Sequence, residues 1–197
     1  MFNILNMKTQ IIVALKFLFI MTILTGLVYP LIMTGVAQIT FPSKANGSLI
    51  RKDDKIMGSS LISQKFDSTI YFWSRPSAID YNPIPSGASN YGPTSEKLKK
   101  QKEAWSHTFA VKNLLTDTSS LPKEMISASG SGLDPDISPE AAILQVNRVA
   151  LYRKYNDSQK QKLVSLIKNL TEEPQFLIFG ERRINVFKLN LALDKIE

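Results

Sequence analysis

The sequence contains no cysteine and only one histidine, His107, among its 197 residues. Without cysteine, the chain has no disulfide bonds, no thiol catalysis and no thiolate metal ligands. With a single imidazole, a metal site would depend mainly on carboxylates. We therefore predict no catalytic residue and no metal ligand in this chain.

Charged residues are absent from positions 17–43, between Lys16 and Lys44. A bilayer-spanning helix needs about 20 mostly apolar residues, and a helix on the surface of a soluble protein would show a polar face. We predict a short tail over 1–11, a transmembrane helix over 12–39 and a folded domain over 40–197. A cleaved signal peptide is the alternative, but its apolar region would span about 7–15 residues, and positions 35–38 make a poor cleavage site.

Small, polar or helix-kinking residues recur every four positions within the predicted span. They are Thr22, Gly26, Pro30, Thr34 and Gln38. Membrane helices associate through small residues and interhelical hydrogen bonds, so we predict that this stripe binds partner helices. The alternative is that such residues are simply common in isolated spans. Pro30 predicts a kink, and the lack of ionisable groups means that this helix alone does not line an ion pathway.

The basic residues around the span leave its orientation open. Lys8 and Lys16 precede it, whereas Lys44, Arg51, Lys52 and Lys55 follow it. By the positive-inside rule, the larger number of basic residues after the span would place the domain in the cytoplasm. Long domains, however, cross membranes largely regardless of charge. We favour a single-pass protein with a cytoplasmic N-terminus and an extracytoplasmic domain.

The net charge of +7 does not predict a nucleic-acid partner. The domain keeps a net charge of +5, because Lys8 and Lys16 are the only charged residues before residue 44. The basic cluster at Lys97–Lys102 is interrupted by Gln101 and is typical of a solvated helix face.

Periodicity in the remaining sequence predicts a single mixed α+β domain. Helices are expected from residue 94 or 95 to about 115, from Pro139 to about 155 with Ser138 as N-cap, and from Asp157, as N-cap, to about 170. Strands are expected near 48–51, 57–64, 70–73 and 125–128, with a hairpin formed by 176–179 and 184–189. Val111 and Ile143 are assigned to inward faces, and His107 to the surface.

Two loops carry the residues that we predict to bind partners. The segment 77–93 suits a binding loop, because it combines polar and turn-forming residues over an unusual length. The Ser-Gly-Ser-Gly sequence at 129–132 favours a tight turn before a helix; an anion site, a cation site with Asp134 and Asp136, and a hydrolase loop with Ser131 and His107 remain alternatives. The predicted partner-binding residues are Arg75, Tyr81, Asn90, Ser129, Ser131 and Asp134.

Several spaced blocks carry a specific resemblance to a known family. They read TGLVYPLIMTGVAQITFP at 25–42, YFWSRPSAIDYN at 71–82, SGASNYGPTS at 86–95, ASGSGLDPDISPEAA at 128–142 and GERRINVFKLNLALD at 180–194. On these blocks the chain closely resembles the KdpC family, the C subunits of bacterial Kdp potassium-transporting P-type ATPases. Ala88 stands where a second glycine is usual in that family, and Arg182 where proline is often found.

The resemblance implies an accessory subunit of the bacterial inner membrane, without a catalytic centre or a cofactor of its own. Its implied partners are the potassium-translocating A subunit, the ATP-hydrolysing B subunit, the small F subunit and membrane lipid. The family's C subunit is described as stabilising the assembly and as a catalytic chaperone that raises the ATP affinity of the B subunit, and the region of Gln145 is implied in nucleotide contact.

An extracytoplasmic domain would not meet cytosolic ATP. An effect on ATP affinity would then be a coupling between distant sites. Two other functional classes remain as alternatives: a membrane-anchored envelope hydrolase and a stand-alone ligand-binding module.

Overall fold

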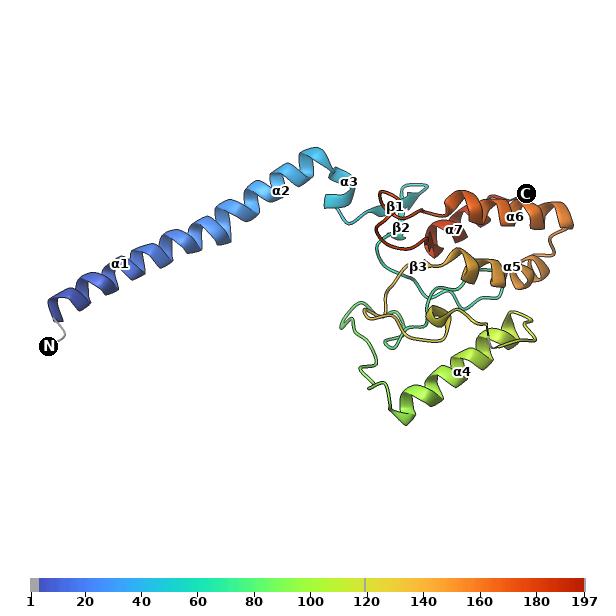
Figure 1. Ribbon diagram of the computed structural model, residues 1–197. Helices are drawn as coiled ribbons and strands as arrows, with labels where there is room; N and C mark the ends of the chain where they lie inside the picture. Colours follow the sequence, from blue (N-terminus) through green and yellow to red (C-terminus); the bar gives the residue numbers. More distant parts are fainter. Residues whose placement is uncertain (1–3, 119, 197) are drawn as a thin grey trace. The chain divides into compact units, whose positions relative to one another are not determined.

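A computed structural model describes residues 4–118 and 120–196 of the chain. The chain forms two compact units, Met1–Leu49 and Ile50–Glu197 (Figure 1). The first unit is a long apolar helix, and the second is a domain of helices and very short strands. The predicted α+β class with one long N-terminal apolar helix is confirmed.

The first unit is helical almost throughout. It consists of α1 (Ile4–Ile23), a π-helical turn η1 (Leu24–Val28), α2 (Tyr29–Thr40) and one further turn, α3 (Pro42–Ala45). Residues Met7–Thr40 form a candidate membrane span, and no residue of its most apolar window is buried inside the protein. At about 1.5 Å per residue the helix is longer than the roughly 30 Å hydrocarbon core, so it has ample length to cross a bilayer.

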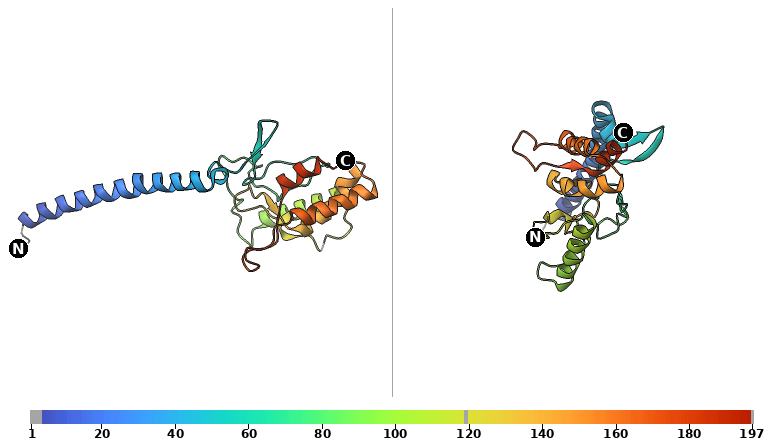
Figure 2. Two further views of the ribbon diagram at one scale, coloured as in Figure 1. Left: turned by 90° about the horizontal axis from the view of Figure 1, so that it is seen from above. Right: turned by 90° about the vertical axis from the view of Figure 1, so that its right-hand side faces the viewer.

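The π-helical turn lies directly before Pro30. The Tyr29 N–H donates to the carbonyl of Leu24, five residues back, instead of to the usual residue four back. Proline has no N–H, and its ring clashes with the carbonyl four residues earlier in a regular α-helix. The wider turn relieves that clash, and the helix continues through Pro30 as a gentle curve (Figure 2).

The second unit begins with a hairpin formed by β1 (Leu49–Lys52) and β2 (Lys55–Ser59). Its two turn residues, Asp53 and Asp54, have positive φ values of 50° and 60°, which two-residue hairpin turns require. The strand expected over 57–64 begins earlier and ends at Ser59. The chain then leaves the hairpin, and the Ser63 N–H donates to the carbonyl of Leu133 at 2.8 Å.

Five further helical segments and a second two-stranded sheet complete this unit. They are α4 (Glu96–Lys112), the 3-10 turn η2 (Lys123–Met125), β3 (Asp136–Ile137), α5 (Pro139–Tyr152), α6 (Asp157–Leu170), β4 (Ile184–Asn185) and α7 (Val186–Leu193). The two strands pair antiparallel. Figures 1 and 2 show α5, α6 and α7 together on one side and α4 on the other, with irregular segments between them. Phe72, Phe109, Val149, Leu163 and Leu189 belong to the core that joins both sides.

Local capping signals fixed two helix starts. The Ser138 hydroxyl accepts the Ala141 N–H at 3.1 Å, so the predicted N-cap of α5 is confirmed. The start of α6 is one residue earlier than expected. Asn156, not Asp157, is the N-cap, because its side chain and that of Gln159 each accept the other residue's N–H at 2.9 Å.

Several expectations about the elements of this unit were wrong, including the strand over 176–179, where the chain turns and the Phe179 N–H donates to the Gln175 carbonyl at 2.9 Å. The segment 184–189 is mostly helix α7, because Val186, Leu189 and Leu193 are buried at helical spacing and Asn185 caps the Lys188 N–H. Residues 125–128 contain the end of a 3-10 turn rather than a strand. Val111 and Ile143, assigned to inward faces, are 57% and 42% exposed.

Asp136 on β3 gives a testable pH dependence. Burial raises the pKa of its carboxyl group, an effect that the Arg183 guanidinium at 3.4 Å opposes. The folded state therefore favours the protonated form, so the stability contribution is present below the ordinary pKa of about 3.9 and is lost as pH rises through the raised pKa. We expect Asp136→Asn to be more stable than the native chain at pH 7, with the difference vanishing near pH 3.5 in urea unfolding. A variant that is less stable at both pH values would contradict this reasoning.

Candidate functional site

The two loops predicted to bind partners lie against each other. The Ser129 N–H donates to the carbonyl of Pro76 at 3.3 Å, and the Gly87 N–H donates to the carbonyl of Ser131 at 3.0 Å. Gly132 has a φ of +71°, and a Cβ added there would lie 2.8 Å from the carbonyl oxygen of Gly87. The turn over 129–134 therefore holds the first half of the long loop by backbone contact.

Arg75 and Asp134 form an ion pair that joins the same two segments. The guanidinium lies 2.9 Å from the carboxylate, and both side chains are partly buried. The Tyr81 hydroxyl donates to the Arg75 carbonyl at 2.8 Å. Burial raises the pKa of Tyr81, so its hydroxyl stays a neutral donor at physiological pH. The sequence singled out all three residues but did not reveal that they contact one another.

The serine hydroxyls of the turn accept hydrogen bonds from backbone N–H groups of the same turn. The Ser131 hydroxyl accepts the Leu133 N–H at 3.1 Å, and that of buried Ser129 accepts the Asp134 N–H at 3.5 Å. These contacts agree with the tight-turn interpretation. His107 is exposed on α4, as expected. Asn90 lies further along the loop, exposed and with a φ of 52°.

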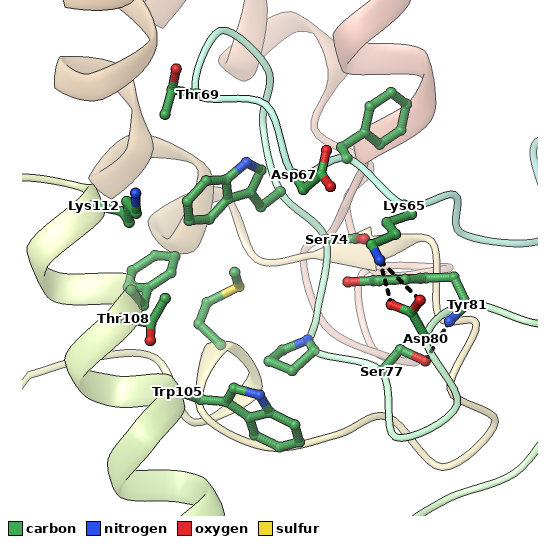
Figure 3. A pocket seen from close by; sticks show the side chains of 15 residues that line it. Lys65, Asp67, Thr69, Ser74, Ser77, Asp80, Tyr81, Trp105, Thr108 and Lys112 are labelled. Carbon is green, nitrogen blue, oxygen red and sulfur yellow. Dashed lines mark hydrogen bonds and ion pairs between the residues drawn. The ribbon is translucent and has the colours of Figure 1, made fainter.

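A cavity of about 420 Å³ opens between residues 65–81 and α4 (Figure 3). Both tryptophans, Trp73 and Trp105, line it together with Tyr81 and Met125. At its edge, the Lys65 ammonium lies 2.8 Å from the Asp80 carboxylate. The contribution of Trp105 from α4 was not evident from the sequence, because no local pattern links it to the distant residues that line the same cavity.

Gln145 lies on α5 and is fully buried. Its Oε1 accepts the Trp73 N–H and an Arg148 N–H, each at 2.8 Å. Its Nε2 donates to the carbonyls of Trp73 and Ala141 at 3.1 and 3.3 Å. Every polar atom of this side chain therefore has a partner within the domain.

Gln145 belongs to a set of three side chains, with Arg148 and Asn190, that we call the backbone clamp. Asn190 exchanges two hydrogen bonds with the backbone of Phe72, at 2.8 and 2.9 Å. Arg148 donates to the carbonyls of Thr69 and Tyr71. The strand expected over 70–73 is absent: the chain turns at 68–71, where the Tyr71 N–H donates to the Ser68 carbonyl at 3.3 Å, and the backbone of Phe72 and Trp73 pairs with side chains instead of with another strand.

The stripe along the first unit is not buried inside the chain. A Cβ added at Gly26 would meet nothing within 4 Å. Thr22 donates its hydroxyl to the Leu18 carbonyl, and Gln38 exchanges hydrogen bonds with Asn46. The polar groups at Thr22 and Gln38 are thus already hydrogen-bonded within the chain.

These features define a membrane-associated protein with one long apolar helix and a small α+β domain. The family model described as "KdpC: K+-transporting ATPase, c chain" matches residues 11–195. The chain is 46% identical over 180 residues to the potassium-transporting ATPase KdpC subunit of Caldanaerobacter subterraneus subsp. tengcongensis, covering 91% of each chain. The KdpC subunit of Burkholderia vietnamiensis is 45% identical over 192 residues, covering 95% of this chain and 97% of the relative. The chain belongs to the KdpC family.

Proposed function

We propose that this chain is a non-catalytic accessory subunit that stabilises a potassium-transporting ATPase complex in the bacterial cell membrane. The match to the family over residues 11–195 carries this proposal. Its partners would be the potassium-translocating A subunit, the ATP-hydrolysing B subunit and the small F subunit, in contact with lipid. The engagement of the Ser131 hydroxyl within its turn and the exposure of His107 favour this role over that of a hydrolase.

The stripe on the long helix would dock on partner helices. We expect Gly26→Leu with Thr34→Leu to reduce co-purification of the complex about tenfold, because leucine at position 26 blocks close helix approach and leucine at position 34 removes a hydroxyl whose interhelical hydrogen bond would contribute about 1–2 kcal/mol. Thr25→Leu with Gly35→Leu is the matched control, since it makes the same two replacements off the stripe. The measurement is the yield of the other subunits recovered with a tagged chain. Equal recovery with both double variants would refute docking through the stripe.

The domain would lie on the extracytoplasmic side. The native chain has no cysteine, so a cysteine introduced at Ile84, which is 81% exposed, is a unique label site. We expect a membrane-impermeant maleimide to label this variant in intact spheroplasts. Labelling only after the membrane is opened would place the domain in the cytoplasm.

An effect on ATP affinity would be transmitted to the B subunit and would not come from nucleotide contact by Gln145. Its amide is fully hydrogen-bonded within the domain, which favours a positioning role for this side chain. We expect a photoreactive ATP analogue to label the B subunit of the purified complex and to leave peptides containing Gln145 unlabelled. Labelled Gln145 peptides would overturn this part of the proposal.

A stand-alone ligand-binding module is the second candidate, and the aromatic cavity is the observation that favours it. The two candidates predict different effects of removing the chain. If the chain is an accessory subunit, its removal would lower the potassium-dependent ATPase activity of the complex. If it is a separate module, its removal would leave that activity unchanged.

A further inference from the structure

Four consecutive, highly exposed apolar residues of the second unit lie at the tip of the loop between α6 and β4. Phe176, Leu177, Ile178 and Phe179 are 86%, 85%, 77% and 65% exposed. We call these four residues the apolar tip. The loop that carries it projects from the body of the domain in both views of Figure 2. Four consecutive large apolar side chains in water are unfavourable, and such exposure marks an interaction site.

The backbone of the apolar tip is hydrogen-bonded within the loop. The N–H groups of Leu177, Ile178 and Phe179 donate to the carbonyls of Pro174, Gln175 and Gln175, and the Gln175 N–H donates to the carbonyl of Phe179. Backbone donors that lack water need internal partners in a hydrocarbon environment. This turn therefore carries few unsatisfied donors if the surrounding water is replaced by lipid.

Charged residues flank the apolar tip without entering it. Residues 174–180 carry no charge, and ion pairs follow directly on both arms of the loop. Arg182 lies 3.0 Å from Glu173, and Arg183 lies 3.0 Å from Glu172. An apolar end with charges directly behind it is the distribution expected at the boundary between hydrocarbon and lipid headgroups.

A lipid surface fits this tip better than the surface of another protein. The four side chains are exposed around a narrow turn, so a flat protein surface would cover only part of them, whereas fluid lipid surrounds them all. Only six residues lie between Ser43, the end of the charge-free run, and Ile50 at the start of the domain, so the connection reaches at most about 25 Å. The span therefore keeps the domain next to a membrane surface.

We propose that the apolar tip inserts into the interfacial region of the same membrane that holds the long helix. Its insertion depth is limited to the boundary region, because the charged arms follow within a few residues. The inserted tip gives the domain a second attachment to the bilayer and restricts its rotation about the short connection to the helix.

The test uses the full-length chain in nanodiscs of phosphatidylcholine and phosphatidylglycerol. Single-cysteine variants Ile178→Cys and Ile84→Cys carry the same environment-sensitive NBD label; both isoleucines are highly exposed, and Ile84 lies in the other long loop. We expect nitroxide-labelled lipid to quench the label at 178 at least threefold more than the label at 84, and iodide to quench it less. Adding Phe176→Ser and Phe179→Ser to the Ile178→Cys variant is expected to reduce lipid quenching to the level at 84.

Two results would overturn the proposal. One is equal lipid quenching at positions 178 and 84 in discs that contain this chain alone. The other is protection of position 178 from iodide only after the remaining ATPase subunits are added, which would assign the tip to a protein interface. The first result is obtained with this chain alone, so it does not depend on the proposed role of the chain in the transport complex.

Discussion

Replacing Arg148 with alanine is expected to lower the free energy of unfolding of the domain by about 4 kcal/mol, since each buried acceptor left without its donor costs about 1–3 kcal/mol. Arg148 is fully buried. Its guanidinium donates to Asn113 and Gln145 as well as to the carbonyls of Thr69 and Tyr71, at 2.6–2.8 Å. Its removal leaves Asn113 Oδ1 and the carbonyls of Thr69 and Tyr71 without this donor and opens a void beside Trp73, whereas Gln145 Oε1 keeps the Trp73 N–H.

The charge on Arg148 has no carboxylate partner within 4 Å among the described residues. Burial lowers the pKa of Arg148 to about 10, so the guanidinium remains charged at neutral pH. Carbonyl oxygens and the face of Trp73, whose ring centre lies 4.1 Å from the guanidinium carbon, stabilise it instead. A lysine has no planar fork of donors, so Arg148→Lys is expected to recover only part of the lost stability.

Guanidinium chloride unfolding of the full chain in detergent, followed by tryptophan fluorescence, measures both variants. Arg51→Ala, which removes an exposed arginine from β1, is the control and is expected to change stability by less than about 0.5 kcal/mol. If Arg148→Ala unfolds at the same denaturant concentration as Arg51→Ala, the clamp does not hold the domain together.

Gly132→Ala is the second substitution with a large expected effect, about 2–4 kcal/mol, because it combines left-handed backbone strain with overpacking. The added Cβ would lie 2.5 Å from Ile79 Cγ1 and 2.8 Å from the carbonyl oxygen of Gly87. A side-chain carbon can move, but the carbonyl belongs to the backbone of the opposite segment. The long loop is therefore expected to separate from the turn.

Gly130→Ala provides a matched control two residues away. A Cβ added at Gly130 would meet nothing within 4 Å, and its φ lies outside the left-handed range. We expect limited proteolysis to cut the 77–93 segment much faster in Gly132→Ala than in the native chain, and at the native rate in Gly130→Ala. Equal cleavage of the two variants would show that close packing at Gly132 does not hold the loop.

Elements with signals in neighbouring residues were predictable from the sequence. The charge-free run identified the apolar helix, and Ser138 followed by Pro139 identified the start of α5. The segment at 184–189 was expected to form a hairpin with 176–179. Only Ile184 and Asn185 form a strand, and helix α7 begins at Val186, because Val186, Leu189 and Leu193 pack into a core formed by distant parts of the chain.

The sequence drew attention to residues of the two loops but did not reveal the contacts between them. Tyr81 and Asp134 were noticed because their loops are unusual in composition and length. Arg75 contacts both residues, and these contacts form only because two segments about fifty residues apart pack together. No local sequence pattern predicts that packing. Arg148 was not recognised because an arginine in an amphipathic helix normally lies in solvent.

The side-chain pairing of residues 69–73 has a consequence for solubility. An extended segment with unpaired backbone groups offers a template on which another chain can add a strand. Here the N–H and C=O groups of Phe72 and Trp73 are bonded to Asn190 and Gln145. The segment consequently presents no free edge at these two residues on which another chain could add a strand.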